Sequence, residues 1–92
     1  MKTRKLDLAE YLETDEDIQE FLKEASATCT SEEFIHALNT AARAKGMTEV
    51  AKQAGVTRAS LYKSLSAGGN PRFETISKIV HALGCNLAVV GH

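Results

Sequence analysis

The stretch from Met47 to Gly68, MTEVAKQAGVTRASLYKSLSAG, constrains the fold of this chain more than any other feature. Ala51 is small enough to let two helices approach closely. Gly55 stands where the chain must turn, because a residue without a Cβ takes a positive φ at little cost. Val56 is apolar and can fill the corner, and Thr57 is a good N-cap because its hydroxyl accepts a backbone N–H of the next helix. The pattern predicts a short helix, a tight turn and a second short helix.

The second helix of this stretch divides its residues between an inward and an outward face. Leu61 faces the interior. The positions expected to face outward near the start of the helix are Arg58, Ala59, Tyr62 and Lys63, with Ser60 close by. In a helix-turn-helix unit, this part of the second helix meets base edges in the DNA groove. We therefore predict a DNA-binding helix-turn-helix.

Charge is segregated along the chain, although the formal total is only −1. From Met1 to Glu33 the chain has four basic and ten acidic side chains, a net of −6. From Phe34 to His92 it has seven basic and two acidic side chains, a net of +5, and the two halves together give −1. The second half is cationic, as phosphate binding requires. With 92 residues, the chain has the length of one small domain with a thin core, which dimerisation can supplement.

Residues 1–30 are predicted to form an acidic N-terminal helical segment. The apolar cluster between Leu6 and Leu12 indicates a short helical turn. Thr14 begins a helix start signal, since the three acids that follow it favour the positive end of the helix dipole. Apolar residues at positions i, i+3, i+4 and i+7 make this helix amphipathic: Ile18, Phe21, Leu22 and Ala25.

Residues 31–92 are predicted to form the DNA-binding domain. Thr30 and Glu33 have the spacing of a capping box before a helix that should end near Gly46. A loop rich in glycine and the only proline precedes the last helix, expected over 74–83. Gly84 suits the position just after it.

The segment from Asn86 to Val90 is short and has high β propensity. A lone strand cannot satisfy its own hydrogen bonds, so it needs a partner strand. The same strand of a second subunit would supply one and give a two-fold homodimer. The expected fold is therefore all-α, with five or six short helices, a lambda-repressor-like helix-turn-helix core and a short C-terminal β-strand.

Other features of the sequence argue against several classes of function. Cys29 and Cys85 lack metal-type spacing and are expected to be free thiols, with a disulfide left open. His36 and His81 stand alone on their helices, so no metal site is expected. We find no nucleophile–base pair and no phosphate-binding glycine loop, and expect no enzymatic activity and no cofactor. The absence of a signal peptide or membrane-length apolar run predicts a cytoplasmic protein.

The chain resembles the helix-turn-helix antidote proteins of addiction modules, antitoxins of the Xre/Cro class paired with small basic RelE/ParE-like toxins. The resemblance covers nearly the whole length. It is carried by YLETDEDIQEFLKEA, ALNTAARAKGMTEVAKQAGVTRASLYKSLS, GNPRFETI and KIVHALG in that order. One departure is Ser64, where an apolar residue is usual in the wider pattern. Leu61 and Leu65 are candidates to cover that gap.

The resemblance implies a repressor of its own operon that also neutralises a toxin by direct contact. Double-stranded DNA would be bound by a dimer on an inverted repeat. The residues that match the base-reading face are Arg58, Ala59, Ser60, Tyr62 and Lys63, and the candidates for phosphate contact are Thr48, Thr57, Asn70 and Arg72. Alternatives stay open for several of these residues. Arg58 and Lys63 can be merely solvated, Tyr62 can pack on the preceding helix, and Asn70 can belong to a simple turn.

The acidic N-terminal helix is the candidate surface for the toxin, since opposite charge steers association with a basic partner. The partner-facing acids would be Asp15, Glu16, Asp17, Glu20 and Glu24, with Phe21 and Leu22 as apolar anchors. The alternative is a helix that packs on its own domain and keeps its acids in water. Two other functions remain as alternatives: a stand-alone repressor of the same fold without a toxin, and a protein-interaction module with a degenerate helix-turn-helix.

Overall fold

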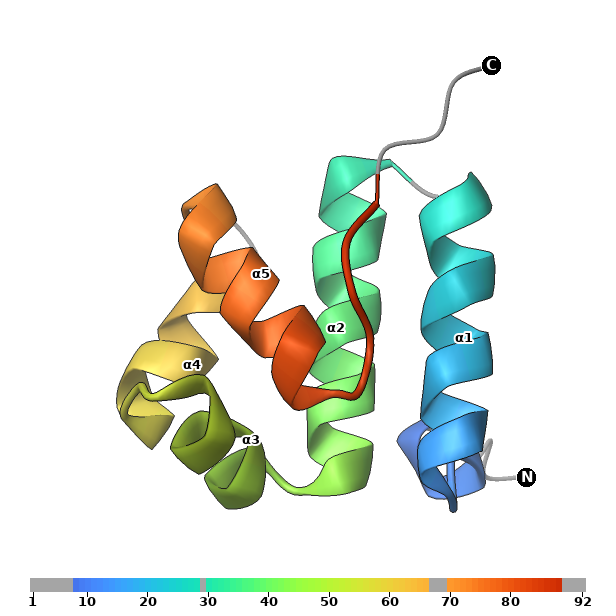
Figure 1. Cartoon of the computed structure of the whole chain (residues 1–92), viewed down its shortest axis with the longest axis horizontal. Helices are drawn as coiled ribbons and strands as arrows, with labels where there is room; N and C mark the ends of the chain where they lie inside the picture. The colour runs from blue at the N-terminus through green and yellow to red at the C-terminus, as the bar shows by residue number, and fades with distance from the viewer. Residues whose placement is uncertain (1–7, 29, 67–69, 89–92) are drawn as a thin grey trace, which may run out of the picture.

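A computed structural model describes residues 8–28, 30–66 and 70–88, and all the regular secondary structure in this part of the chain is helical. A short 3₁₀ turn, η1 (Leu8–Tyr11), is followed by five α-helices: α1 (Asp15–Thr28), α2 (Ser31–Lys45), α3 (Met47–Ala54), α4 (Arg58–Ser64) and α5 (Phe73–Ala82). The all-helical prediction and the helix count are confirmed for these residues. The helices α1 and α2 lie side by side and run in opposite directions, while α3, α4 and α5 gather on the other side of α2 (Figure 1).

Side-chain caps fix where the first two helices begin. The hydroxyl of Thr30 accepts the backbone N–H of Glu33 at 3.3 Å, and the Glu33 carboxylate accepts the N–H of Thr30 at 3.1 Å. This reciprocal pair is the predicted capping box. At the start of α1, Thr14 accepts the N–H of Asp17 at 3.1 Å, and the Asp17 carboxylate accepts the N–H of Thr14 at 3.2 Å. Each helix start therefore has two of its otherwise unpaired N–H groups satisfied.

The change of direction between α2 and α3 occurs at a single residue. Gly46 has φ 111° and ψ 115°, a conformation that side chains disfavour, and its N–H donates to the carbonyl of Ala42 at 2.9 Å. Its carbonyl accepts the N–H of Val50 at 3.0 Å and so starts the next helix. The predicted end of α2 near Gly46 is confirmed, and α3 follows without any intervening loop.

The core draws apolar side chains from all five helices. Its largest fully buried members are Leu38, Leu61, Ile79, Leu83 and Val50. Alanines fill the places where helices approach closely: Ala37, Ala41, Ala42, Ala51, Ala54 and Ala82. Because an alanine side chain leaves little room between backbones, a larger residue at these positions would overpack the core. The apolar faces expected from the sequence for α1 and α5 lie in this core, with Ile18, Leu22, Ile79 and Val80 at most 3% exposed.

The chain leaves α5 through Gly84, which has a φ of 84°, as its predicted place after the last helix requires. A Cβ at Gly84 would lie 2.8 Å from the side-chain nitrogen of Gln19, so the end of α5 reaches α1. Residues 85–88 form no strand, and 89–90 lie outside the described residues. The C-terminal strand and the division of the chain at residue 30 stay predictions.

Three further features concern the described residues alone. None of their helices is long and apolar enough to cross a membrane. No three of their His, Cys, Asp or Glu side chains are grouped so that they could hold a metal ion. Cys85 is a free thiol, and partial burial raises its pKa, which lowers the fraction of reactive thiolate; Cys29 lies outside the described residues.

Candidate nucleic-acid interface and acidic helix

The turn between α3 and α4 has the local chemistry that the sequence predicts. Gly55 is left-handed, with φ 73° and ψ 29°, and its N–H donates to the Lys52 carbonyl at 3.3 Å. Val56 is half-buried against the core, and its N–H donates to the carbonyl of Ala51 at 3.0 Å. Thr57 then accepts the N–H of Ser60 at 3.0 Å and caps α4. The short turn thus fixes the direction in which α4 leaves α3.

The helix α4 is only seven residues long and is held to the domain from one side. Leu61 is 0% exposed and Leu65, just after the helix, is 3% exposed. Leu61 therefore faces the interior as expected, and both leucines lie in the core, whereas Ser64 is half-buried. The residues predicted to face outward are all exposed: Arg58, Ala59, Ser60, Tyr62 and Lys63.

Arg58 and Tyr62 contact each other on this exposed face. One terminal nitrogen of the Arg58 guanidinium donates to the Tyr62 hydroxyl at 3.2 Å, and the guanidinium carbon lies 5.4 Å from the ring centroid. Tyr62 is 45% exposed. Its contact with Arg58 therefore lies on the outer face of α4. This pair is not among the contacts predicted from the sequence, although the i, i+4 spacing on a helix is the signal that indicates it.

The candidate phosphate contacts lie near helix starts. Thr48 is exposed in the first turn of α3, and Thr57 precedes α4. Asn70 and Arg72 are exposed just before α5, where Arg72 is the N-cap residue and makes no side-chain capping bond. Helix starts present free backbone N–H groups, which suit a phosphate. Contact with DNA is a prediction for all four residues.

The two acids of the cationic half are each engaged on their own helix. Gln53 donates to the Glu49 carboxylate at 2.9 Å on α3, and Lys78 lies 3.4 Å from the Glu74 carboxylate on α5. Among the described residues, no carboxylate lies within ion-pair distance of Arg58, Lys63 or Arg72. These three cations therefore keep their charge available to an external anion.

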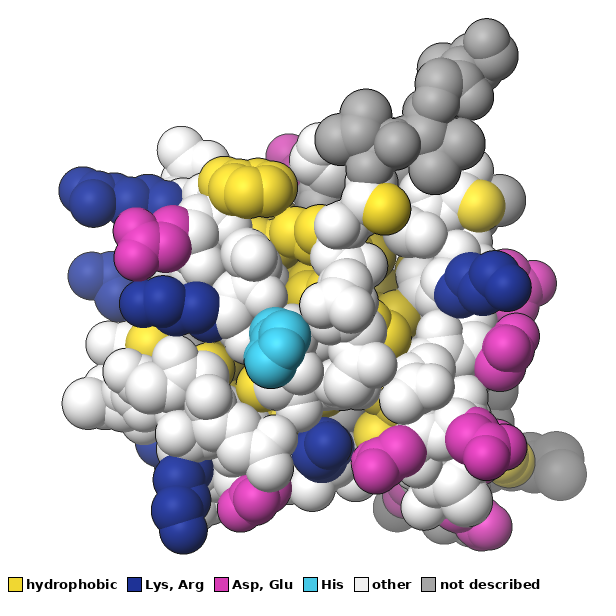
Figure 2. All heavy atoms as spheres, viewed as in Figure 1, with side chains coloured by type: hydrophobic (Ala, Val, Ile, Leu, Met, Phe, Trp, Pro, Cys, Tyr) yellow, Lys and Arg dark blue, Asp and Glu magenta, His cyan; other side chains and the backbone are white. Residues whose placement is uncertain are grey.

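The separation of charge in the sequence is also a separation in space. Figure 2 shows most of the dark blue Lys and Arg side chains of this face over the α3–α5 side and most of the magenta Asp and Glu side chains over the α1 side. A few side chains of the opposite sign lie on each side. The electrostatic potential of the molecule is therefore uneven, with the cationic end at the three short helices.

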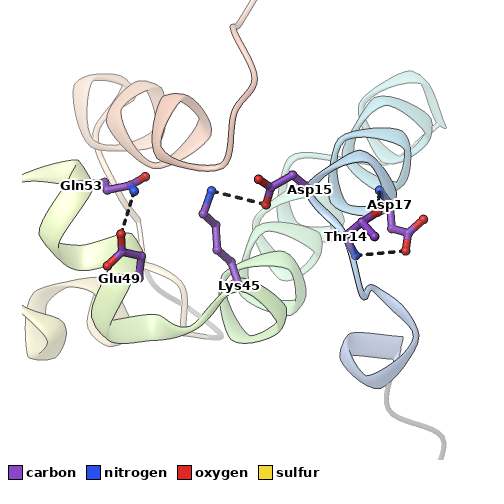
Figure 3. A network of polar contacts seen from close by, with 6 residues as sticks. All are labelled: Thr14, Asp15, Asp17, Lys45, Glu49 and Gln53. Carbon is purple, nitrogen blue, oxygen red and sulfur yellow. Dashed lines mark hydrogen bonds and ion pairs between the residues drawn. The ribbon is translucent and has the colours of Figure 1, made fainter.

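The acidic candidates of α1 are exposed, but not all of them are free of other roles. All five acids proposed from the sequence face solvent: Asp15, Glu16, Asp17, Glu20 and Glu24. Asp15 lies 3.6 Å from the Lys45 ammonium at the end of α2, and Asp17 caps its own helix (Figure 3). A substitution at either residue would change the packing or capping of α1 as well as its charge.

The two apolar candidates of α1 face the domain. Leu22 is 3% exposed and belongs to the core, and Phe21 is half-buried against that core. In the single chain, Leu22 therefore packs α1 onto the rest of the domain. Toxin contact stays a prediction for both residues, and only Phe21 presents part of its surface to solvent.

Comparison with known proteins gives a family for this fold and these surfaces. The chain is 41% identical over 83 residues to an uncharacterized protein of Haemophilus influenzae strain Rd, an alignment that covers 90% of this chain and 86% of that relative. No solved structure matches the chain. Residues 2–91 match the family model described as probable addiction module antidote protein. The chain therefore belongs to the family of probable addiction module antidote proteins.

Proposed function

We propose that this protein is the antitoxin of a type II toxin–antitoxin module, in which it neutralises a small basic RelE/ParE-like toxin and represses its own operon. In this proposal, α3 and α4 form an Xre/Cro-type helix-turn-helix within a lambda-repressor-like domain. The protein would act in the cytoplasm as a homodimer, without a cofactor and without enzymatic activity. Membership in the antidote family supports the toxin-neutralising role.

The observation that carries the DNA-binding role is the exposed face of α4. Leu61 anchors this helix in the core, and the residues around it point polar and cationic groups into solvent. Arg58 or Lys63 would donate to guanine O6 and N7, where a good bidentate contact discriminates between bases by about 1–3 kcal/mol. Ala59 would contact a thymine methyl group. The exposed Arg72 would contact the phosphate backbone and fix the register without reading sequence.

The toxin would bind at the other end of the molecule, on the exposed carboxylates of α1. Glu16 and Glu20 are the clearest candidates because they face solvent and neither caps a helix nor pairs with a described cation. A toxin that acts on RNA is expected to be basic, so opposite charge would speed its encounter with α1. Because α1 and α4 lie on opposite sides of α2 (Figure 1), one chain could hold toxin and DNA together.

A two-fold dimer would place two copies of α4 about 34 Å apart along one side of the duplex. The operator would then be an inverted repeat whose half-sites are separated by about 10 base pairs. A footprint on the protein's own promoter tests this geometry. A single, unrepeated protected site would count against the dimeric arrangement.

Affinity capture from the native host, with this protein as bait and mass spectrometry as the readout, tests the antitoxin role. A stoichiometric small basic protein encoded beside it would support the proposal. If no such partner is recovered while promoter binding is intact, a stand-alone repressor of the same fold is the better description.

Salt titration of promoter binding tests the DNA-binding role, because phosphate contacts make affinity fall steeply with salt. Arg58→Ala should weaken binding to the promoter more than binding to unrelated DNA. Arg72→Ala, the matched control, should weaken both alike. DNA binding that is absent or insensitive to salt would leave a protein-interaction module as the function.

A further inference from the structure

We propose that Tyr62 is a positioning residue that holds the Arg58 guanidinium ready to read a guanine. This inference rests on the proposed DNA-binding role and assigns it a specific pair of side chains. It starts from the contact on the exposed face of α4, where Arg58 donates to the Tyr62 hydroxyl at 3.2 Å and its guanidinium carbon lies 5.4 Å from the ring centroid. Hydrogen bond and cation–π contact together restrict a side chain that would otherwise sample many rotamers.

Among the described residues, Tyr62 is the only one that makes a hydrogen bond, ion pair or ring contact with the Arg58 guanidinium. No described carboxylate lies within ion-pair distance of this guanidinium. A carboxylate partner would orient an arginine too, but it would also neutralise the charge and occupy the paired donors that a base needs. A tyrosine orients the group and leaves it cationic. The pair therefore has the properties of a support for an arginine that binds an external acceptor.

The contact leaves enough donors for a base. A guanidinium has five N–H donors, and Tyr62 accepts one of them from a terminal nitrogen. The remaining donors still include adjacent pairs that can approach guanine O6 and N7 together. Arg58 is the first residue of α4, Tyr62 follows one turn later, and both side chains are exposed, so no rearrangement of the core is needed for such an approach.

An arginine that is already ordered loses less conformational entropy when it binds. The general cost of immobilising one long side chain corresponds to a factor of about 2 to 12 in affinity. Removing the Tyr62 support should therefore reduce binding to the correct sequence by a factor in this range. Binding to unrelated DNA, where Arg58 has no guanine partner in register, should change much less.

The experiment compares affinity for the protein's own promoter with affinity for a scrambled duplex of equal length at one salt concentration. Tyr62→Phe keeps the ring and removes the hydroxyl, so we expect the ratio of the two affinities to fall about threefold. Tyr62→Ala removes both contacts and should lower it up to about tenfold. Tyr11→Ala, at another exposed tyrosine on η1, is the matched control and should leave the ratio unchanged.

A double-mutant cycle separates positioning from an independent DNA contact. If Tyr62 acts through Arg58, Tyr62→Ala should have no further effect on the ratio in an Arg58→Ala background. If Tyr62→Ala lowers the affinity ratio equally in the wild-type and Arg58→Ala backgrounds, the inference is overturned, while DNA binding by α4 stays in place. Wild-type protein that fails to prefer its promoter would overturn the proposed function, and this inference with it.

Folding must be monitored in the same variants. Circular dichroism and the urea midpoint should be close to wild type for Tyr62→Phe, because the exposed ring keeps its place and only a hydroxyl is lost. An unchanged affinity ratio in folded Tyr62→Phe and Tyr62→Ala proteins would show that Arg58 does not depend on Tyr62.

Discussion

The Nζ atom of Lys45 lies 3.6 Å from an oxygen of the Asp15 carboxylate, so the last residue of α2 is paired with the first residue of α1. The two ends of this pair are in different environments, since the Lys45 side chain is 19% exposed and that of Asp15 is 71% exposed. Water screens the carboxylate, while most of the lysine side chain is buried. The pair positions α1 on α2 more than it stabilises the fold.

Asp15→Asn should therefore lower the free energy of unfolding by no more than about 1 kcal/mol, as is usual for exposed ion pairs. The loss should be larger at low ionic strength than at high ionic strength, because salt screens the interaction. Urea unfolding at two salt concentrations measures both effects. Lys45→Met keeps the aliphatic side chain and removes the charge. If Asp15→Asn lowers the free energy of unfolding by the same amount in this background, Asp15 acts through the helix dipole and not through Lys45.

Reversal of charge at Glu20 tests the acidic surface of α1 without disturbing a cap or the Lys45 pair. Glu20→Lys should slow association with the proposed basic toxin and leave the unfolding midpoint nearly unchanged, because long-range attraction governs the encounter rate. Surface plasmon resonance at several salt concentrations measures the association rate constant. The difference from wild type should shrink as salt is added.

Glu32→Lys is the matched control for that experiment, since it makes the same change of net charge at an exposed position of α2. It should slow toxin association less than Glu20→Lys. Equal effects of the two substitutions would mean that only total charge matters, and α1 would lose its place as the docking surface.

Leu61→Ala should destabilise the protein by about 2–5 kcal/mol, because it opens a cavity under α4 where the side chain is fully buried. This is a large part of the stability of a small domain. Phe73→Ala removes a larger side chain that is 76% exposed at the start of α5 and should change stability by no more than about 0.5 kcal/mol. Urea unfolding of both variants measures the contrast. Similar losses would mean that Phe73 is covered in solution.

The capping box of α2 predicts a dependence of stability on pH. Hydrogen bonds from the backbone N–H and side chain of Thr30 hold the pKa of Glu33 below its ordinary value of 4.5. A carboxyl group with a lowered pKa in the folded state stabilises the protein above the unfolded-state pKa, and this stabilisation is lost as the pH falls through the folded-state pKa.

Glu33→Gln retains an oxygen acceptor but has no charge. Wild type should therefore be more stable than this variant at pH 7, and the difference should diminish below about pH 4.5. Urea midpoints measured across this range test the prediction. A constant difference at all pH values would assign the effect to geometry alone.

Local signals in the sequence predicted the helix boundaries well. Thr30 with Glu33 identifies the start of α2, and Gly55 followed by Thr57 identifies the turn before α4, because each motif satisfies backbone groups within a few residues. The burial of Leu61 followed from helical periodicity in the same way. These features depend only on neighbours along the chain, which the sequence displays directly.

Contacts between helices could not be predicted from the same information. Periodicity shows that Asp15 faces outward, but the position of Lys45 beside it depends on how α1 packs against α2. Leu22, considered from the sequence as a partner anchor, lies in the core because that packing covers it. Arg58 and Tyr62 have a spacing that permits contact on a helix, but whether Tyr62 faces inward or toward Arg58 depends on how α4 packs on the domain.

The separation of acidic α1 from the cationic short helices has a consequence for motion as well as for binding. A polyanion repels one end of such a molecule and attracts the other, so it exerts a torque before any atoms touch. At physiological ionic strength this torque acts within roughly 8 Å, and at low salt it reaches further. The protein would arrive at a nucleic acid already rotated, with its short helices leading and α1 trailing, and would spend less of each encounter in rotational search.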